Sequence, residues 1–226
     1  MTFNALKQLL YGLYLTNSFG WRLKHADDPM EKKRLRLAYS EAQLKTLNIT
    51  VKIENPDKLP KEDQYLIVIN HRSIIDPPIV ETALKETTLF GPWISKKELY
   101  NSFFFGLFVR HAGSILLDRE QSQMSGFFAD IKSAVKEGKS IFIFPEGTRN
   151  KTEEAISSFK EGSRIIALKN RLPILPIYIK SDAQKALKSA LANKHLHQEV
   201  LVEVGELIDY KDRTDLETSY RQRFGL

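Results

Sequence analysis

Residues 65–78 read YLIVINHRSIIDPP: an apolar run, then a histidine and an aspartate, then two prolines. The run 65–69 is typical of a buried strand, and parallel α/β sheets hold their functional groups just past such strands. Asp76 before Pro77 is typical of a helix start, with the aspartate as N-cap and the proline just inside. If the loop is tight, Asp76 holds one imidazole nitrogen of His71, and the other is free to take a proton from a hydroxyl. A structural histidine beside an N-cap is the alternative.

Strand patterns and helix patterns alternate on both sides of this stretch. Apolar runs or alternating apolar residues predict strands at 48–54, 65–69, 89–94, 114–117, 141–144, 172–179 and 200–204. Helical spacing predicts helices between them, at 78–84, 96–109, 124–138, 159–169 and 184–191. We therefore expect an α/β fold: a single domain with a largely parallel or mixed seven-stranded sheet flanked by helices. The residues after 204 show little pattern that would predict a helix or a strand.

The first 48 residues are the one plausible appendage. Apolar and aromatic residues at helical spacing predict a first helix, and Asp27-Asp28-Pro29 precede a second, basic helix at 30–47. We expect an amphipathic helical pair at 1–48 that interacts with a membrane surface, and a functional domain at 49–226. The alternative is a helical pair packed on the domain core. We predict no signal peptide and no transmembrane span, because no run approaches the roughly 20 apolar residues that a span needs.

Composition narrows the function classes. The chain has 226 residues, 42% of them hydrophobic, which suits one substantial core. It has no cysteine, so disulfides and thiolate chemistry are excluded. The net charge of +6 favours an acidic partner, such as nucleic acid, anionic lipid or a phosphorylated substrate, although it is equally compatible with a solubility role.

Three polar stretches follow predicted strands: 71–76, 118–119 and 146–149. Because strand ends converge at one edge of a parallel sheet, these stretches are expected to share a pocket. Arg149 would bring a guanidinium suited to bidentate binding of a phosphate or carboxylate, and Gly147 would let the backbone approach a ligand closely. A surface cation is the ordinary alternative for Arg149.

Several chemistries lack their motifs. The chain has no Gly-x-Ser-x-Gly elbow, no Walker loop and no dinucleotide glycine fingerprint. We expect no metal site, because His111, His195 and His197 lack clustered carboxylates or cysteines. We also expect no nucleic-acid partner, because no recognition motif accompanies the charge. The remaining mechanism has no covalent protein intermediate: a base activates a hydroxyl of one substrate against an electrophile of the other.

Four blocks in this order resemble the glycerolipid acyltransferase family, and within it the 1-acylglycerol-3-phosphate (lysophosphatidate) acyltransferases. They are the His-x4-Asp motif at 70–76, the segment 96–119, FPEGTR at 144–149 and LPILP at 172–176, and a further family segment matches at 159–162. Two positions depart from the family pattern. Phe103 stands where the family often has proline, and Asn150 stands where it often has serine.

The resemblance implies roles for these residues. His71 would deprotonate the sn-2 hydroxyl of a lysophosphatidate, and Asp76 would hold its tautomer. The expected glycerol-phosphate ligands are Glu146, Gly147, Thr148 and Arg149, with added positive charge from Lys96, Lys97 and Arg119. The aromatic run supplies candidates for an acyl channel: Phe103, Phe104, Phe105 and Phe108.

The product would be phosphatidate for phospholipid biosynthesis. The acyl donor would be acyl-CoA or acyl-acyl carrier protein, used as a co-substrate with no other cofactor. Family members of this size resemble monotopic enzymes, so we expect a peripheral or monotopic protein at the cytoplasmic face of an anionic membrane. Three alternatives stay open: an acyltransferase for another lysophospholipid or lyso-aminolipid, a hydrolase, and a non-catalytic lipid-binding module.

Overall fold

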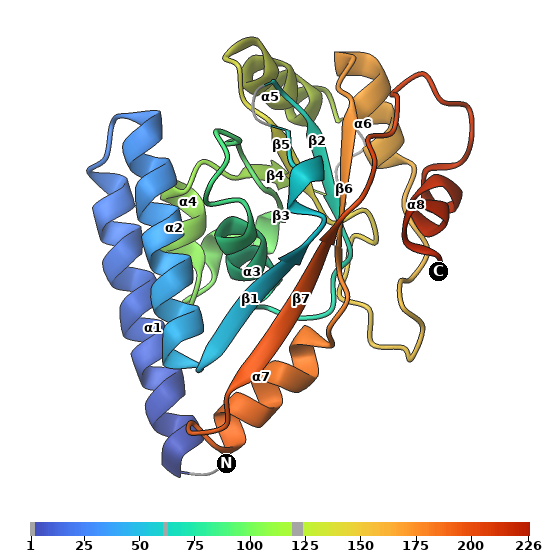
Figure 1. Ribbon diagram of the computed structural model, residues 1–226. Helices are drawn as coiled ribbons and strands as arrows, with labels where there is room; N and C mark the ends of the chain where they lie inside the picture. The colour runs from blue at the N-terminus through green and yellow to red at the C-terminus, as the bar shows by residue number, and fades with distance from the viewer. Residues whose placement is uncertain (1–2, 61–62, 119–123) are drawn as a thin grey trace.

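The structure is a computed structural model that describes residues 3–60, 63–118 and 124–226, and strands and helices alternate along these ranges (Figure 1). The strands are β1 Ile49–Glu54, β2 Leu66–Ile69, β3 Ile94–Lys96, β4 Ile115–Leu117, β5 Ile141–Ile143, β6 Ile174–Ile179 and β7 Gln198–Val204. The α-helices are α1 Phe3–Lys24, α2 Pro29–Thr46, α3 Asp76–Ala83, α4 Gly106–His111, α5 Ser125–Lys136, α6 Gly162–Asn170, α7 Ala183–Ala192 and α8 Leu216–Phe224. Two 3-10 helices are η1 Pro56–Lys58 and η2 Lys97–Asn101.

The strands form two sheets. Five of them make a mixed sheet in the order β1-β7-β6-β2-β5, in which β2, β5 and β6 are parallel and β1 and β7 run the other way. β3 and β4 make a small parallel sheet, joined to the larger one by a bridge between Trp93 and Phe142. The α/β class and the seven predicted strands are therefore confirmed in the described part of the chain, although the strands divide between two sheets.

This topology decides where polar loops meet. The Trp93–Phe142 bridge is parallel, so β3 and β4 point the same way as β2, β5 and β6. These five strands point to the same edge, and the loops after β2 and β5 meet there, since Asn150 N donates to the His71 carbonyl. This is the convergence expected from the sequence, because parallel strands present their carboxyl ends together.

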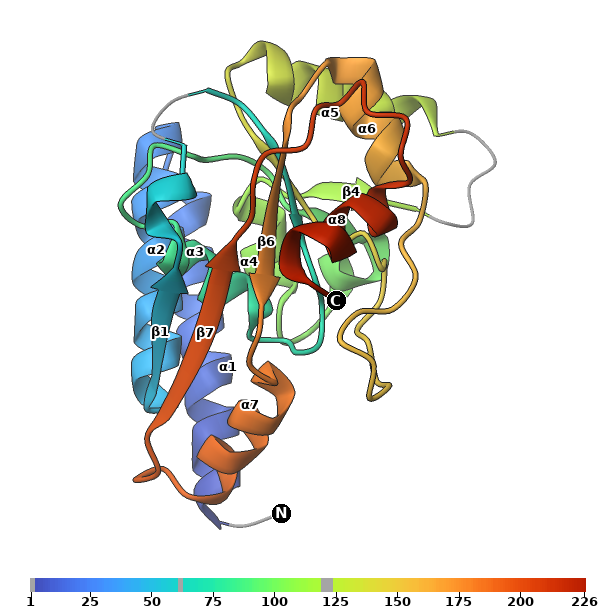
Figure 2. The same cartoon turned by 45° about the vertical axis from the view of Figure 1, so that its right-hand side comes forward.

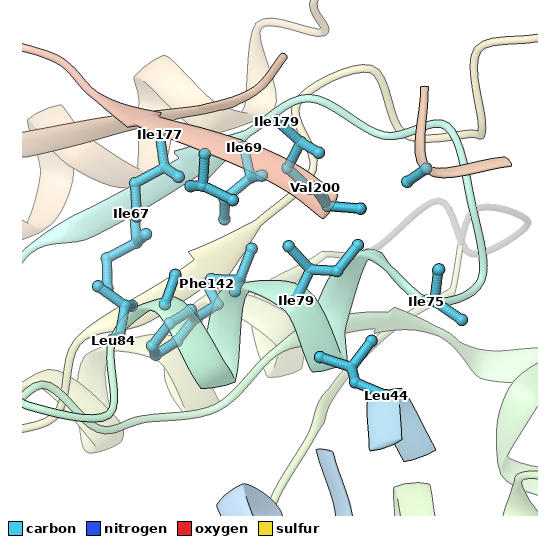
Figure 3. Packing of buried hydrophobic residues seen from close by; sticks show 14 of the residues in the cluster. Leu44, Ile67, Ile69, Ile75, Ile79, Leu84, Phe142, Ile177, Ile179 and Val200 are labelled. Atoms are coloured by element: carbon cyan, nitrogen blue, oxygen red, sulfur yellow. The ribbon is translucent and has the colours of Figure 1, made fainter. Parts of the chain in front are cut away.

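Helices cover both faces of the large sheet. Strand β2 is buried on both sides: Leu66 and Val68 face one core, and Ile67 and Ile69 face the other. The core around Ile67 and Ile69 includes Ile79 of α3 (Figure 3) and residues of α7. The core around Leu66 and Val68 includes α5, α6 and α8, which lie on the side of the sheet away from α1 and α2 (Figure 2). A strand with both faces buried reads as a continuous apolar run, which is why the sequence predicts β2 well.

The N-terminal helices α1 and α2 form the predicted pair and lie side by side (Figure 1). Leu15, Phe19 and Leu23 of α1 pack on Leu35 and Tyr39 of α2 in a third apolar cluster. The carboxylate of Asp28 caps α2 by accepting a hydrogen bond from Glu31 N at 2.9 Å. None of the helices in the described ranges combines the length and hydropathy needed to cross a bilayer.

Three local predictions differ from the structure. The helix predicted at 96–109 is divided into η2 and α4, because the backbone of Ser102 is extended. The strand predicted at 89–94 starts only at Ile94, since Pro92 has no N–H to donate to a ladder. Helix α8 was not predicted at all. Its signals are Asp215, which caps Thr218 N at 3.0 Å, and Gly225, which ends the helix in the left-handed region.

Candidate active site

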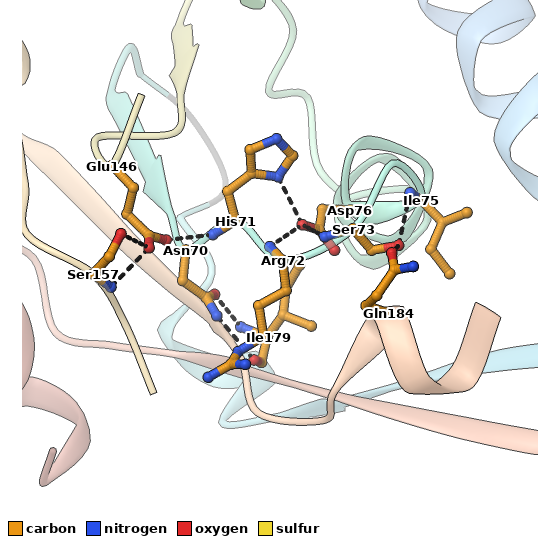
Figure 4. Close-up of polar contacts among 10 residues, drawn as sticks. All are labelled: Asn70, His71, Arg72, Ser73, Ile75, Asp76, Glu146, Ser157, Ile179 and Gln184. Atoms are coloured by element: carbon orange, nitrogen blue, oxygen red, sulfur yellow. Dashed lines mark hydrogen bonds and ion pairs between the residues drawn. The ribbon is translucent and has the colours of Figure 1, made fainter. Parts of the chain in front are cut away.

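The loop after β2 brings His71 and Asp76 into contact (Figure 4). The Nδ1 atom of His71 lies 2.8 Å from Oδ2 of Asp76, whose side chain is only 1% exposed. An ionised carboxylate only accepts hydrogen bonds, so in the neutral form of the imidazole the proton lies on Nδ1 and the lone pair on Nε2. The pair has the geometry of a general base and its orienting carboxylate.

The carboxylate of Asp76 also closes the loop. The same Oδ2 atom accepts from the backbone N–H groups of Arg72 at 2.7 Å and Ser73 at 2.8 Å. The prediction that Asp76 is the N-cap of the next helix is wrong: α3 begins at Asp76 itself, the cap position is Ile75, and no side chain caps the helix. The physical reason is that the carboxylate turns back to the loop amides, which keeps it beside the imidazole.

Aromatic rings hold the other side of the imidazole. The His71 ring stacks on Phe144 with 4.0 Å between centroids and 13° between planes. Phe144 in turn stacks on Trp93 at 5.0 Å and 28°. Phe144 directly follows β5, so the strand that carries the 144–149 block also supplies the surface against which the histidine lies.

Glu146 ties the histidine to this block. Its Oε1 accepts from His71 N at 2.6 Å, and its Oε2 accepts from Ser157 N at 2.8 Å and from the Ser157 hydroxyl. In return, Asn150 N donates to the His71 carbonyl at 2.6 Å. Glu146 is buried, and both carboxylate oxygens are directed to protein groups (Figure 4). Its predicted contact with glycerol phosphate stays a prediction.

The rest of the 146–149 stretch faces outward. Gly147 has φ +69° in a turn in which its N–H donates to the Phe144 carbonyl, a conformation that favours glycine. Thr148 and Arg149 are exposed, and among the described residues no carboxylate lies within ion-pair distance of Arg149. The guanidinium is therefore available for an anionic ligand at the edge that holds His71.

The predicted lysines lie at the end of β3. Lys96 is exposed, and Lys97 forms an ion pair with Asp118 at 2.7 Å, which joins the ends of β3 and β4. Arg119 lies outside the described residues. The structure therefore brings the 71–76 and 146–149 stretches into direct contact and places Lys96 at the same sheet edge.

The four predicted channel phenylalanines have different environments. Phe103 is 85% exposed and, with residues of α1, lines an open apolar hollow of about 510 Å³. Phe104 and Phe105 pack on each other at 4.6 Å, whereas Phe108 packs on Tyr39 at 4.4 Å in the cluster of the helical pair. An acyl channel along all four stays a prediction.

Several supporting residues were missed. Asn70 is buried and bridges to β6, accepting from Ile179 N at 2.8 Å and donating to the Ile179 carbonyl at 3.1 Å. The guanidinium of Arg72 donates to the carbonyls of Thr152 and Glu154. The position of Asn70 and Arg72 on either side of His71 was a usable signal, since a strand end needs polar partners for its free backbone groups.

Helix α8 braces the 146–159 loop from behind. Glu217 accepts from Phe159 N at 3.0 Å, and Arg221, ion-paired to Glu217, donates to the Ile156 carbonyl at 3.5 Å. The Phe159 ring packs edge-on against buried Tyr220 at 5.2 Å. Nothing in the local sequence connects these positions.

Among the residues that the structure describes, no three histidine, aspartate or glutamate side chains gather as ligands for a metal ion. The structure thus combines an α/β fold with a hydrogen-bonded His71–Asp76 pair beside a loop that exposes Arg149. The sequence model of the Acyltransferase family matches residues 50–180, more than half of the chain, and the chain belongs to this family.

Individual relatives share a more specific name. The chain is 36% identical over 115 residues to a 1-acyl-sn-glycerol-3-phosphate acyltransferase of Helicobacter pylori, covering 50% of this chain and 47% of that protein. It is 30% identical over 133 residues to the protein of the same name from Streptococcus pneumoniae, covering 58% and 48%. The chain thus spans about half the length of the curated relatives it matches.

A solved structure resembles the whole fold. The crystal structure of the 1-acyl-sn-glycerophosphate (LPA) acyltransferase from Thermotoga maritima superposes with a TM-score of 0.69, covering 97% of this chain and 91% of that one. At 21% sequence identity this likeness supports the fold alone.

Proposed function

We propose that this protein transfers an acyl group from a thioester to the sn-2 hydroxyl of 1-acylglycerol 3-phosphate, giving phosphatidate for phospholipid biosynthesis. The observation that carries this proposal is the His71–Asp76 pair, whose histidine is hydrogen-bonded through its backbone N–H to Glu146 in the loop that presents Arg149. A base next to a cation suits an acceptor that has a hydroxyl and a phosphate. The relatives named as 1-acyl-sn-glycerol-3-phosphate acyltransferases support this choice of acceptor.

The chemistry is a single acyl transfer. Nε2 of His71 takes the proton of the acceptor hydroxyl while the hydroxyl oxygen bonds to the thioester carbonyl carbon. The carbon–sulfur bond then breaks, and the imidazolium gives its proton to the leaving thiolate. Asp76 stabilises the imidazolium between the two transfers, because its buried carboxylate lies 2.8 Å from Nδ1.

The acceptor phosphate binds to Arg149, with the backbone around Gly147 and Thr148 approaching it. Lys96 adds positive potential at the same edge, and Lys97 contributes by holding Asp118. Glu146 acts indirectly in this scheme, since its two oxygens hold the histidine loop and the segment at Ser157. The acyl donor is the thioester of CoA or of acyl carrier protein, and no resident cofactor takes part.

The helical pair at 1–48 attaches the domain at 49–226 to the cytoplasmic face of an anionic membrane. Support comes from α1, which leaves large apolar side chains exposed: Leu6, Leu9, Leu10, Tyr11, Tyr14 and Trp21. Exposed apolar patches of this kind mark interaction surfaces, and an amphipathic helix with basic neighbours suits anionic headgroups.

Acyl transfer is tested with purified protein, mixed micelles, an acyl-CoA or acyl-carrier-protein donor, and a panel of acceptors. We expect phosphatidate from lysophosphatidate and a loss of at least about a thousandfold in kcat for His71→Ala. His195→Ala is the matched control and should keep full activity. Wild-type rates from His71→Ala, or transfer to other lysolipids alone, would contradict the proposal.

Membrane attachment is tested by vesicle sedimentation with anionic and with zwitterionic lipid. Leu10→Ser on α1 should weaken binding to anionic vesicles. Leu168→Ser on α6 removes an equally exposed leucine, 54% against 57%, and should bind as wild type does. Equal binding by both variants would exclude α1 as the attached surface.

A further inference from the structure

A buried ion pair that the acyl-transfer chemistry does not use joins α2 to α3. Arg36 of α2 is 2% exposed and donates through Nε to Glu81 Oε1 at 3.0 Å and also through Nη2. Its Nη1 donates to the Gly91 carbonyl at 2.6 Å, and its guanidinium lies 5.0 Å from the centre of the Phe90 ring. Burying two charges costs much of what their attraction returns, so stability alone is a weak reason for this pair.

The carboxylate of Glu81 has a third donor. The indole Nε1 of Trp93 donates to the same Oε1 atom at 2.8 Å. Trp93 stacks on Phe144, and Phe144 stacks on His71. A continuous series of contacts therefore leads from Arg36 through Glu81 and two aromatic rings to the imidazole.

This series supplies what the His71–Asp76 hydrogen bond lacks. One hydrogen bond at Nδ1 leaves the imidazole free to tilt about the line between the two atoms. The face of Phe144, 4.0 Å away and nearly parallel, removes that tilt and aims Nε2. Glu81 also lies on α3, the helix that begins at Asp76, so one carboxylate supports both members of the pair.

We propose that Arg36, Glu81 and Trp93 are positioning residues for His71, and that α2 therefore belongs to the support of the catalytic pair as well as to the membrane-attached helices. The kinetic part of this inference rests on the proposed acyl transfer. The geometric part, which concerns the orientation of the imidazole, does not rest on the proposed acyl transfer.

The test compares two double variants that leave no unpaired buried charge. Arg36→Met with Glu81→Met removes the acceptor of the indole N–H, whereas Arg36→Met with Glu81→Gln keeps an amide oxygen there. We expect the first to lower kcat by about tenfold with KM unchanged for both substrates, since small misplacements of a catalytic group are costly. The second should recover most of that loss. When Trp93→Phe is added to both double variants, their kcat values should become equal, because no indole N–H is left to donate to position 81.

A second readout does not depend on turnover. The His71 ring stacks on the Phe144 face, so the NMR signals of its ring protons should be shifted upfield, and this shift should shrink in the Met/Met variant. Lys85→Met with Glu86→Met, at an exposed ion pair that follows α3, is the matched control and should change neither readout. If the Met/Met protein does not fold, Trp93→Phe alone decides, because it keeps an aromatic ring while removing the N–H together with the five-membered ring that carries it.

The inference would be overturned if the Met/Met variant had the wild-type kcat and an unchanged NMR shift of the His71 ring protons. A rise in KM with no change in kcat would also overturn it. A wild-type protein that shows the upfield shift but no transfer to lysophosphatidate would instead remove the proposed function and leave the positioning intact.

Discussion

Replacing Asp76 with asparagine removes a charge and keeps the shape of the side chain. In the wild-type protein Oδ2 accepts from the His71 ring and from two backbone N–H groups, of Arg72 and Ser73. The asparagine oxygen can still accept from both amides, so the loop should keep its conformation. What is lost is the stabilisation of an imidazolium by an adjacent carboxylate.

The size of that loss follows from the distance and the burial. The ring and carboxylate charges are centred about 4 Å apart, which gives about 4 kcal/mol at an effective dielectric constant of about 20. Since about 1.4 kcal/mol corresponds to a factor of ten in rate, Asp76→Asn should lower kcat by about a thousandfold. KM should change little, because Asp76 is buried and contacts no acceptor group in the proposed scheme.

Thiol release from the acyl thioester, followed with and without lysophosphatidate, measures this rate. Asp28→Asn is the matched control, because it keeps an oxygen that accepts from Glu31 N at the start of α2 and should leave kcat unchanged. Thermal unfolding separates lost chemistry from lost fold. A folded Asp76→Asn protein with less than a tenfold loss in kcat would refute the role of the carboxylate charge.

Three further predictions concern the ligand, the packing and the pH dependence. Arg149→Ala should raise KM for lysophosphatidate by about tenfold or more, as expected for a lost charge-assisted contact, and an unchanged KM in steady-state kinetics would exclude phosphate binding there. Gly91→Ala should lower the free energy of unfolding in urea by about 3 kcal/mol, because its Cβ would lie 1.6 Å from the Ser140 carbonyl oxygen; Gly126→Ala, which meets open space, should not. Burial is the largest cause that lowers the pKa of His111 below its ordinary 6.5, and the surrounding positive charges are the next. Because the folded protein then binds this proton less readily than the unfolded chain, His111 does not affect the free energy of unfolding above pH 6.5 and lowers it as the pH falls below 6.5. His111→Gln should therefore flatten the decline of Tm from about pH 7 to about pH 5, and an identical decline in both proteins would count against this.

The features that the sequence predicts well have short-range physical causes. The run 65–69 is apolar at every position because β2 is covered on both faces, and such a run is visible without any partner. His71 and the 146–149 stretch could be expected to meet because each follows a strand of this kind. Parallel strands then bring their ends together by topology.

What could not be predicted depends on partners distant in the chain. The inward direction of Glu146 is set by His71 N and Ser157, and no local pattern distinguishes this from an outward carboxylate. The division of the seven strands into two sheets depends on which strands pair, and β3 and β4, at three residues each, are too short for periodicity to indicate their partners. The extended backbone at Ser102 is set by packing, which overrides helical spacing in the aromatic run.

The bracing of the 146–159 loop by α8 has a consequence for the order of folding. Glu146 reaches His71 across 75 positions, and Glu217 reaches Phe159 across 58. Contacts of such separation form late, because the entropy of closing the chain is lost before they return any energy. During refolding the return of enzymatic activity should therefore follow the return of helical circular dichroism. Opening of α8 alone would release the loop while the sheet stays folded, so activity should be lost at a lower denaturant concentration than the fold.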